Sequence, residues 1–250
     1  MLRGEKLSAA VALELLIINY IANYNRRMPS SAAQRKPRRP GRPAAGADLR
    51  PRLIDAAIGC FTARGIAGTP LSAIASAAGV TPALLHYYFG DKQKLVEAIV
   101  AERLLPVVVE LRASLERSGG DSVDLSAGFV NAVFELVRRY PWFPALWARE
   151  VLCEGGALRD VVVERLAPQL PQQMERRFRA AQENGQLNPQ LDPRLLVVSL
   201  VGLTLFAAAS APIWRRLFQA DDVDVDSLRR HALALLDTGL HAGMRPTHAR

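Results

Sequence analysis

Apolar residues recur at helical spacing along most of the chain. The first such run lies between Arg50 and Ala63, and its apolar positions are Leu53, Ile54, Ala57, Ile58 and Phe61. This i, i+1, i+4, i+5, i+8 stripe predicts an amphipathic helix. Two shorter runs follow, and beyond residue 121 every segment keeps a helical period without sustained strand alternation. The pattern predicts an all-α protein, with a small three-helix head before a larger helical body.

The two short runs carry the same start chemistry. Thr69-Pro70 and Thr81-Pro82 each place a hydroxyl at an expected N-cap and a proline at the first helical position. Gly79, between them, supplies the left-handed residue that ends one helix and turns into the next. This spacing predicts a helix-turn-helix, whose second helix lies in the DNA major groove. That helix carries His86, Tyr87 and Tyr88, and Lys92 follows it, side chains suited to phosphate and base-edge contacts.

Net charge supports a nucleic-acid partner. The chain carries +8, and residues 26–64, with ten basic and two acidic residues, account for all of it. A basic block beside a helix-turn-helix is typical of nucleic-acid binders, although a merely solubilising tail has the same composition. Within 35–43, RKPRRPGRP resembles an AT-hook-like element, which predicts that Arg38, Arg39 and Arg42 enter the minor groove.

The first 27 residues allow several interpretations. Residues 7–24 are apolar, but they include Glu14, Asn19 and Asn23 and reach only the lower length limit of a membrane span. Their spacing also fits an amphipathic helix that docks loosely, and the natural chain starting at Met28 is the plainest alternative. We expect no membrane partner.

Catalytic and metal chemistry is not indicated. The two cysteines, Cys60 and Cys153, lie far apart and form no C-x-x-C or Cys/His cluster. The chain contains no G-x-S-x-G, no H-E-x-x-H and no phosphate-binding glycine loop. We therefore expect no enzyme activity, no catalytic residues, no metal and no cofactor, in a cytoplasmic protein.

Residues 50–104 resemble the TetR (tetracycline-repressor-like) family of bacterial regulators. The matching positions are Ala56, Ala57, Phe61, Gly65, Thr69, Ile74, Ala75, Ala78, Gly79, Val80, Leu85, Tyr87, Tyr88, Phe89, Lys92 and Leu95. Where the family most often has Tyr, this chain has His86, a change that keeps a ring and a donor but alters the expected base preference.

The resemblance implies an all-helical homodimer that binds double-stranded DNA. Carried over residue by residue, it implies that Thr69, Thr81, Tyr87 and Lys92 hold phosphates. It places Pro82, Ala83, His86 and Tyr88 on or beside the base-reading face. Hydroxyls and a cation at helix starts do bind phosphate well, and small apolar groups suit a thymine methyl.

Two segments of the body predict a subunit interface. Leu195–Ala209 is apolar on nearly every face, which is typical of a helix buried on all sides. Leu228–Leu240 carries a second apolar stripe. Two such helices per subunit would form a four-helix interface, as the resemblance also implies; packing within one monomer is the alternative.

The middle of the body concentrates aromatic residues near a proline-broken segment. Aromatic walls beside irregular backbone suit a hydrophobic small molecule, and an ordinary core is the alternative. The expected ligand-binding residues are Phe129, Phe134, Trp142, Phe143, Trp147, Arg149 and Phe178. Glu150 beside Arg149 fits either a polar group of that pocket or half of a surface ion pair.

These observations predict four regions: an N-terminal extension (1–27), a basic arm (28–49), a helix-turn-helix domain (50–97), and a helical domain for ligand sensing and dimerisation (98–250). Asp91 is expected to cap the helix that joins the last two, and Pro106 predicts a kink or break in it. The predicted function is a ligand-responsive transcriptional regulator, a repressor that a hydrophobic small molecule releases from a pseudo-palindromic operator. The alternative is a non-specific architectural DNA-binding dimer.

Overall fold

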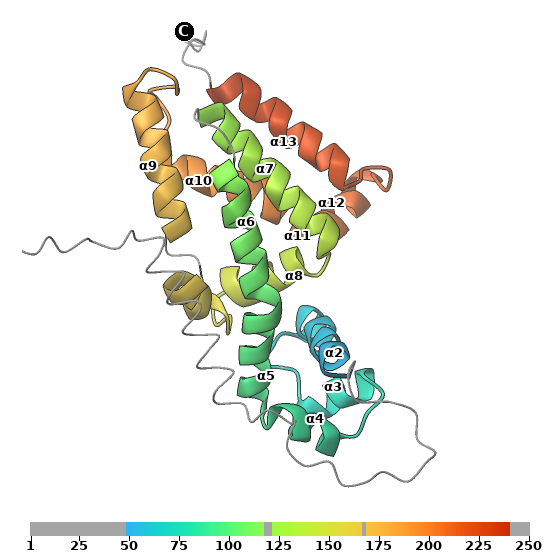
Figure 1. Ribbon diagram of the computed structural model, residues 1–250. Coiled ribbons are helices and arrows are strands. Elements are labelled where there is room, and N and C mark those ends of the chain that lie inside the picture. The colour runs from blue at the N-terminus through green and yellow to red at the C-terminus, as the bar shows by residue number, and fades with distance from the viewer. Residues whose placement is uncertain (1–48, 118–121, 167–168, 241–250) are drawn as a thin grey trace, which may run out of the picture. The chain divides into compact units, whose positions relative to one another are not determined.

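Every regular element in the described part of the chain is a helix, as the sequence pattern predicts (Figure 1). The computed structural model describes residues 49–117, 122–166 and 169–240. Residues 1–48 lie outside these ranges, and with them the predictions for the first 27 residues and for Arg38, Arg39 and Arg42. We call residues 49–99 the head and residues 100–240 the body.

Four helices build the head around one small core. They are α2 (Leu49–Arg64), α3 (Leu71–Ala77), α4 (Pro82–Phe89) and α5 (Lys92–Ile99). The α2 stripe that the sequence predicted is buried throughout. Ile74 of α3, Leu85 and Phe89 of α4, and Leu95 of α5 are buried as well. Because the polar face of each helix remains outside, this core fixes the direction in which α4 presents its other side.

The body contains α-helices interrupted by π-helical segments, which are labelled η. Its elements are η1 (Val100–Leu104), α6 (Leu105–Arg117), α7 (Ser122–Arg139), α8 (Phe143–Trp147), η2 (Ala148–Leu152), η3 (Val161–Leu166), α9 (Gln169–Glu183), α10 (Pro193–Val201), η4 (Gly202–Phe206), α11 (Ala207–Ala209), α12 (Ala211–Phe218) and α13 (Val225–Leu240). The long helix α7 packs against both α6 and α13 (Figure 1). Its apolar side chains form the centre of the body core.

The helix that leaves the head does not end at its proline. Asp91 caps α5 as predicted, accepting the Lys94 N–H at 2.8 Å. The backbone then passes through η1 into α6, which contains Pro106. Proline has no N–H to donate to the preceding turn, and a π-helical segment lies in that turn. Of the predicted kink or break at Pro106, the break is therefore wrong, because the helix continues through the proline and a π-helical segment precedes it.

The apolar helix near the C-terminus is buried on only one side in this chain. Leu196 and Leu200 lie in the core, whereas Leu195 is 63%, Val198 65% and Phe206 58% exposed. A single chain thus leaves apolar side chains uncovered along α10 and η4. Within the described residues no single helix is long and apolar enough to cross a membrane; the pair Pro193–Ala209 and Ala211–Phe218, bent by 71°, passes by length and composition only.

Candidate nucleic-acid interface

The turn between α3 and α4 has the predicted helix-turn-helix geometry. Gly79 adopts a φ of +67°, a left-handed conformation that favours glycine. The Val80 N–H donates to the Ala75 carbonyl at 2.9 Å, which closes the end of α3. Thr81 then caps α4, because its hydroxyl oxygen accepts the Leu84 N–H at 3.3 Å, and Pro82 is the first helical residue. The sequence prediction for this start is confirmed.

One face of α4 is open to a partner. Pro82, Ala83, His86 and Tyr87 are exposed, and Tyr87 reaches 77%. Leu85 and Phe89 occupy the opposite, buried face. The Tyr87 ring is thus available for contact with a partner. The exposed face is the one expected to meet base edges in the major groove.

The histidine on this face has a fixed ring orientation. Its Nδ1 atom lies within hydrogen-bond distance of the Gly90 carbonyl oxygen. Because a carbonyl only accepts, the Nδ1 atom carries the hydrogen in this arrangement. In neutral His86 the Nε2 atom is then an acceptor, suited to the exocyclic amine of adenine or cytosine. Tyr88 is half-buried beside it and packs edge-on against the Tyr87 ring at 5.7 Å between centroids.

Thr69 does not play the part that Thr81 plays. It is fully buried, and its hydroxyl donates to the Gly65 carbonyl at 2.6 Å. Helix α3 starts one residue later than expected, with Pro70 at the N-cap and no side-chain cap. The prediction that the Thr69 side chain caps a helix is therefore wrong, whereas a phosphate contact by Thr69 stays a prediction. The reason is tertiary: the α2–α3 turn folds over the hydroxyl and uses it internally.

Lys92 is also engaged within the head. Its ammonium donates to the carbonyl oxygens of Ile66, Ala67 and Thr69 at 2.9, 3.1 and 3.3 Å. An ammonium has three donors, so all of them are directed at the α2–α3 turn. These bonds hold the α2–α3 turn in place. A phosphate contact by Lys92 stays a prediction.

Arg50 joins three elements of the head and the body, a role that the sequence pattern did not indicate. Its guanidinium donates to Glu102 Oε1 at 2.6 and 3.1 Å and to the Tyr88 carbonyl at 3.4 Å. It also lies 4.7 Å from the centre of the Phe89 ring. The C-terminal end of α4 is therefore fastened to α2 and η1, which fixes the exposed face of α4. In the sequence Arg50 is indistinguishable from the other residues of the basic block.

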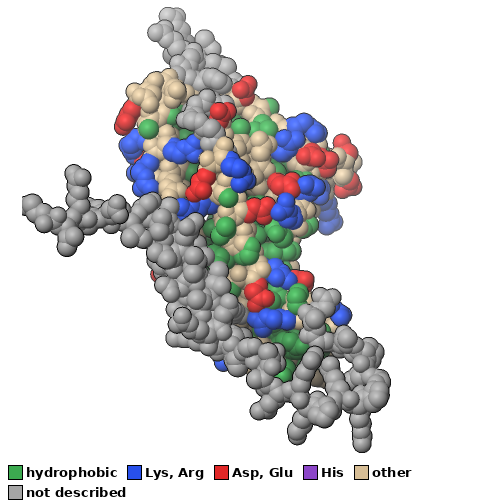
Figure 2. All heavy atoms as spheres, viewed as in Figure 1, with side chains coloured by type: hydrophobic (Ala, Val, Ile, Leu, Met, Phe, Trp, Pro, Cys, Tyr) green, Lys and Arg blue, Asp and Glu red, His purple; other side chains and the backbone are tan. Residues whose placement is uncertain are grey.

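Charged side chains of both signs are interspersed on the body. On the face seen in Figure 2, Lys and Arg side chains lie among Asp and Glu side chains rather than in one basic patch. Several of them form ion pairs across helix faces, among them Arg139 with Glu110 at 2.6 Å. This agrees with the sequence, in which the net positive charge belongs to residues 26–64.

The predicted ligand-binding residues differ in burial. Phe129, Phe134 and Phe178 are buried in the body core. The others are less covered: Trp142, Phe143 and Trp147 are half-buried and Arg149 is exposed. The three core residues match the alternative of an ordinary core. A ligand pocket at these residues stays a prediction.

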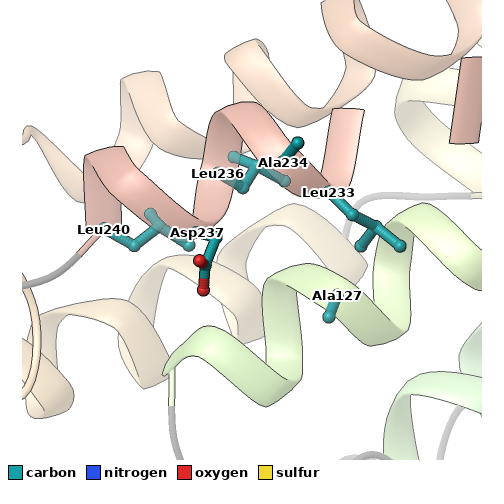
Figure 3. Close-up of a pocket in the computed structure, with 6 residues that line it drawn as sticks. All are labelled: Ala127, Leu233, Ala234, Leu236, Asp237 and Leu240. Atoms are coloured by element: carbon teal, nitrogen blue, oxygen red, sulfur yellow. The ribbon is translucent and has the colours of Figure 1, made fainter. Parts of the chain in front are cut away.

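A hollow of about 370 Å³ lies elsewhere, between α7 and α13 (Figure 3). It is lined by Ala127, Leu233, Ala234, Leu236, Asp237 and Leu240. None of the predicted ligand-binding residues lines it. Its walls are apolar apart from one carboxylate, and the sequence contained no aromatic cluster that would have pointed to it.

Two family models match this chain, one over each part. The model of bacterial regulatory proteins of the tetR family matches residues 53–99, which contain the helix-turn-helix. The model of the tetracyclin repressor-like C-terminal domain matches residues 127–238. The chain belongs to the TetR family. The family resemblance in the sequence is thereby confirmed.

Curated relatives of this TetR-family chain match through the head. The HTH-type transcriptional regulator BetI of Brucella anthropi is 42% identical over 69 residues, which are 28% of this chain and 36% of BetI. The HTH-type transcriptional regulator SrpR of Pseudomonas putida is 36% identical over 73 residues, 28% of this chain and 34% of SrpR. The chain thus spans about a third of the length of the curated relatives that it matches.

Solved structures share the fold over most of this TetR-family chain. The ketosteroid transcriptional regulator KstR2 of Mycobacterium tuberculosis has a TM-score of 0.65 at 19% identity, covering 80% of this chain and 99% of KstR2. The regulator FadR of Bacillus subtilis, solved in complex with stearoyl-CoA, has a TM-score of 0.57 at 19% identity and covers 76% and 98%. At this identity the likeness shows the fold.

Proposed function

We propose that this chain is a transcriptional regulator that binds a pseudo-palindromic operator as a homodimer and is released by a hydrophobic small molecule. The observation that carries the proposal is the exposed face of α4, which is capped by Thr81, fastened by Arg50 and aimed away from the head core. A helix in this position, as the second of a helix-turn-helix pair, enters the major groove in proteins of this architecture. The relatives that match the head are transcriptional regulators by name.

The uncovered apolar side chains support the dimer. Leu195, Val198 and Phe206 fall at i, i+3 and i+11, so they lie near one side of α10 and η4, and Leu235 of α13 is exposed as well. A contact between the same faces of two subunits is self-complementary and closes after two copies. It would present two heads to two half-sites on one side of the DNA.

The release step rests on the aromatic residues of the body. Trp142, Phe143 and Trp147 are half-buried, so rearrangement of the segment that carries them could admit a hydrophobic ligand. FadR, which has the same fold, holds stearoyl-CoA, so the fold can accommodate a long acyl chain. A ligand acts only if it binds the DNA-free arrangement more tightly than the DNA-bound one.

Selection of duplexes from a random-sequence pool by the full chain tests the proposal. We expect convergence on an inverted repeat, bound about a thousandfold more tightly than a shuffled duplex of the same length. Substituting His86→Ala should relax the preference at one position of each half-site, whereas Arg176→Ala, on an exposed face of the body, should leave it unchanged.

Two results would count against it. No convergence, with steeply salt-dependent binding to every duplex, would favour the architectural binder, in which the basic segment 26–64 acts electrostatically. Convergence on a single half-site without a repeat would remove the dimeric operator.

A further inference from the structure

Glu150 is a buried acidic residue of the body that contacts the head. It lies in η2 and is 4% exposed. Its Oε1 atom accepts the Ile66 N–H at 2.9 Å, and its Oε2 atom accepts the Ala157 N–H at 3.1 Å. The two donors belong to the α2–α3 turn of the head and to the turn that follows η2. One carboxylate therefore bridges two segments that are far apart in the sequence.

The head side of this bridge is a braced turn. The Thr69 hydroxyl closes it through the Gly65 carbonyl, and the Lys92 ammonium ties three of its carbonyls to the start of α5. Ile66 itself is buried in the head. A displacement of the Ile66 N–H thus moves a unit that includes the starts of α3 and α5, rather than a loose loop.

On the body side of the bridge, the turn that follows η2 is also held in place by hydrogen bonds and close packing. The Leu158 N–H donates to the Glu150 carbonyl at 3.0 Å, next to the Ala157 bond to the side chain. A Cβ at Gly156 would lie 2.3 Å from the Glu150 carbonyl oxygen, so the turn approaches η2 as closely as only glycine permits. Backbone and side chain of Glu150 are both held by this turn, and its position sets that of the carboxylate.

The helix type at this point allows a discrete change. A π-helical turn holds more residues than an α-helical turn. Conversion of η2 to α-helical hydrogen bonding would shift the helix register by one residue, which rotates Glu150 by about 100°. The carboxylate could not then face both the head turn and the body turn. The Glu150 carboxylate therefore has two discrete states, one that bridges the head and body turns and one that does not, rather than a continuous range of small displacements.

We propose that Glu150 is a positioning residue that couples the body to the DNA-reading head. A rearrangement of η2 or of the turn at 153–158 moves the Ile66 N–H through the carboxylate, and the braced turn passes the displacement to α3 and α4. The use of this coupling to control DNA binding rests on the proposed function. The mechanical coupling itself is independent of it.

The test compares Glu150→Gln with Glu154→Gln in the full chain. Glu154 is exposed in the turn next to η2, so its variant makes the same charge change without touching the bridge. Spin labels at Ala63→Cys in α2 and Gln172→Cys in α9, with the native cysteines replaced and labelled chains diluted into unlabelled ones, report the head–body distance without DNA. We expect Glu150→Gln to shift and broaden this distance distribution and Glu154→Gln to leave it unchanged.

Gly156→Ala approaches the same coupling from the body. The alanine must displace Glu150 or the turn, yet Gly156 has its close contacts with Glu150 and not with the head. We expect the head–body distance to change here too, and amide exchange at Ile66 to become about tenfold faster or more, as after loss of a buried hydrogen bond. If Gly156→Ala fails to fold, Glu150→Gln decides alone.

An unchanged head–body distance in Glu150→Gln would overturn the proposal, even with faster exchange at Ile66 and Ala157, because Glu150 would then be a local brace. For a duplex selected by the wild-type chain, we expect about tenfold weaker binding by Glu150→Gln and wild-type binding by Glu154→Gln. If the wild-type chain selects no duplex while the distance still shifts, the proposed function fails and the coupling stands.

Discussion

Thr69 and Thr81 show how two identical dipeptides take different roles. Each precedes a proline, and the sequence alone predicts the same N-cap for both. Thr81 is exposed and caps α4, whereas Thr69 is buried and donates to the Gly65 carbonyl. The difference arises from the path of the α2–α3 turn, which is a tertiary property.

Replacing each threonine by valine, which is similar in shape, separates the two roles. Thr69→Val removes the hydroxyl that donates to the part-buried Gly65 carbonyl, so we expect a loss of about 1–3 kcal/mol in the free energy of unfolding. Thr81→Val removes an N-cap and should cost about 1 kcal/mol. Chemical denaturation measures both. For a selected duplex, Thr81→Val should weaken binding more than Thr69→Val does at matched folded fractions; the reverse order would identify Thr69 as the more important DNA ligand.

Lys92 gives a second prediction at the level of the residue. Its ammonium serves three carbonyls of the head, so Lys92→Met should lower the free energy of unfolding by about 2 kcal/mol. The neighbouring Lys94 forms only an exposed ion pair with Asp91 at 3.9 Å, so Lys94→Met should change it by less than about 1 kcal/mol. A stable Lys92→Met variant with a reduced salt dependence of DNA binding would instead identify Lys92 as a phosphate ligand.

At the scale of the elements, the sequence predicted where helices with a local apolar stripe or cap begin and lie. It did not predict which helical segments are π-helical rather than α-helical. The α2 stripe, the Thr81 cap of α4 and the Asp91 cap of α5 follow from residues within one or two turns of each other. The π-helical segments and the continuous backbone through Pro106 depend on how the helix packs along its whole length. The spacing of apolar side chains does not distinguish α-helical from π-helical hydrogen bonding.

The exposed apolar side of α10 carries the prediction for the subunit interface. Val198→Asp places a charge on that side, where burial without a partner is unfavourable, and we expect sedimentation to show a shift from dimer to monomer. Val163→Asp in η3 is the matched control, because Val163 is 61% exposed and Val198 is 65% exposed. Dissociation by both variants or by neither would place the interface elsewhere.

At the scale of the whole molecule, net charge is segregated. Residues 26–64 carry +8 and the remainder sums to zero. Counterion release predicts that each phosphate contact contributes about 0.9 to the slope of log affinity against log salt. Joint substitution of Arg38, Arg39 and Arg42 by Gln should therefore lower the slope by up to about 2.7, since 3 × 0.9 = 2.7. Binding titrations across a salt series should show the same decrease in slope for selected and shuffled duplexes.

The control replaces three exposed arginines of the body, Arg165, Arg176 and Arg230, by Gln. It makes the same change in net charge and should alter the slope far less. Equal changes in the two triple variants would mean that long-range charge, and not contact by the basic segment, sets the salt dependence.

The candidate site was predictable where it is made of neighbours in the sequence. The exposed face of α4 came from residues 81–88, which share one helix. Lys92, Arg50 and Glu150 each have a partner between 23 and 84 residues away, and no local pattern specifies such pairs. Glu150 did leave one trace: it falls four residues after the buried Leu146, on the side of the helix that faces inward.

The π-helical turns also bear on how this chain tolerates changes of length. A helix that already contains a wide turn can lose one residue there by changing to α-helical hydrogen bonding, without shifting the faces at its two ends. Single-residue deletions should therefore be accepted within 100–104 and 202–206 more readily than in the unbroken middle of α7. We therefore expect an alignment of related sequences to show gaps inside these helices as well as in loops.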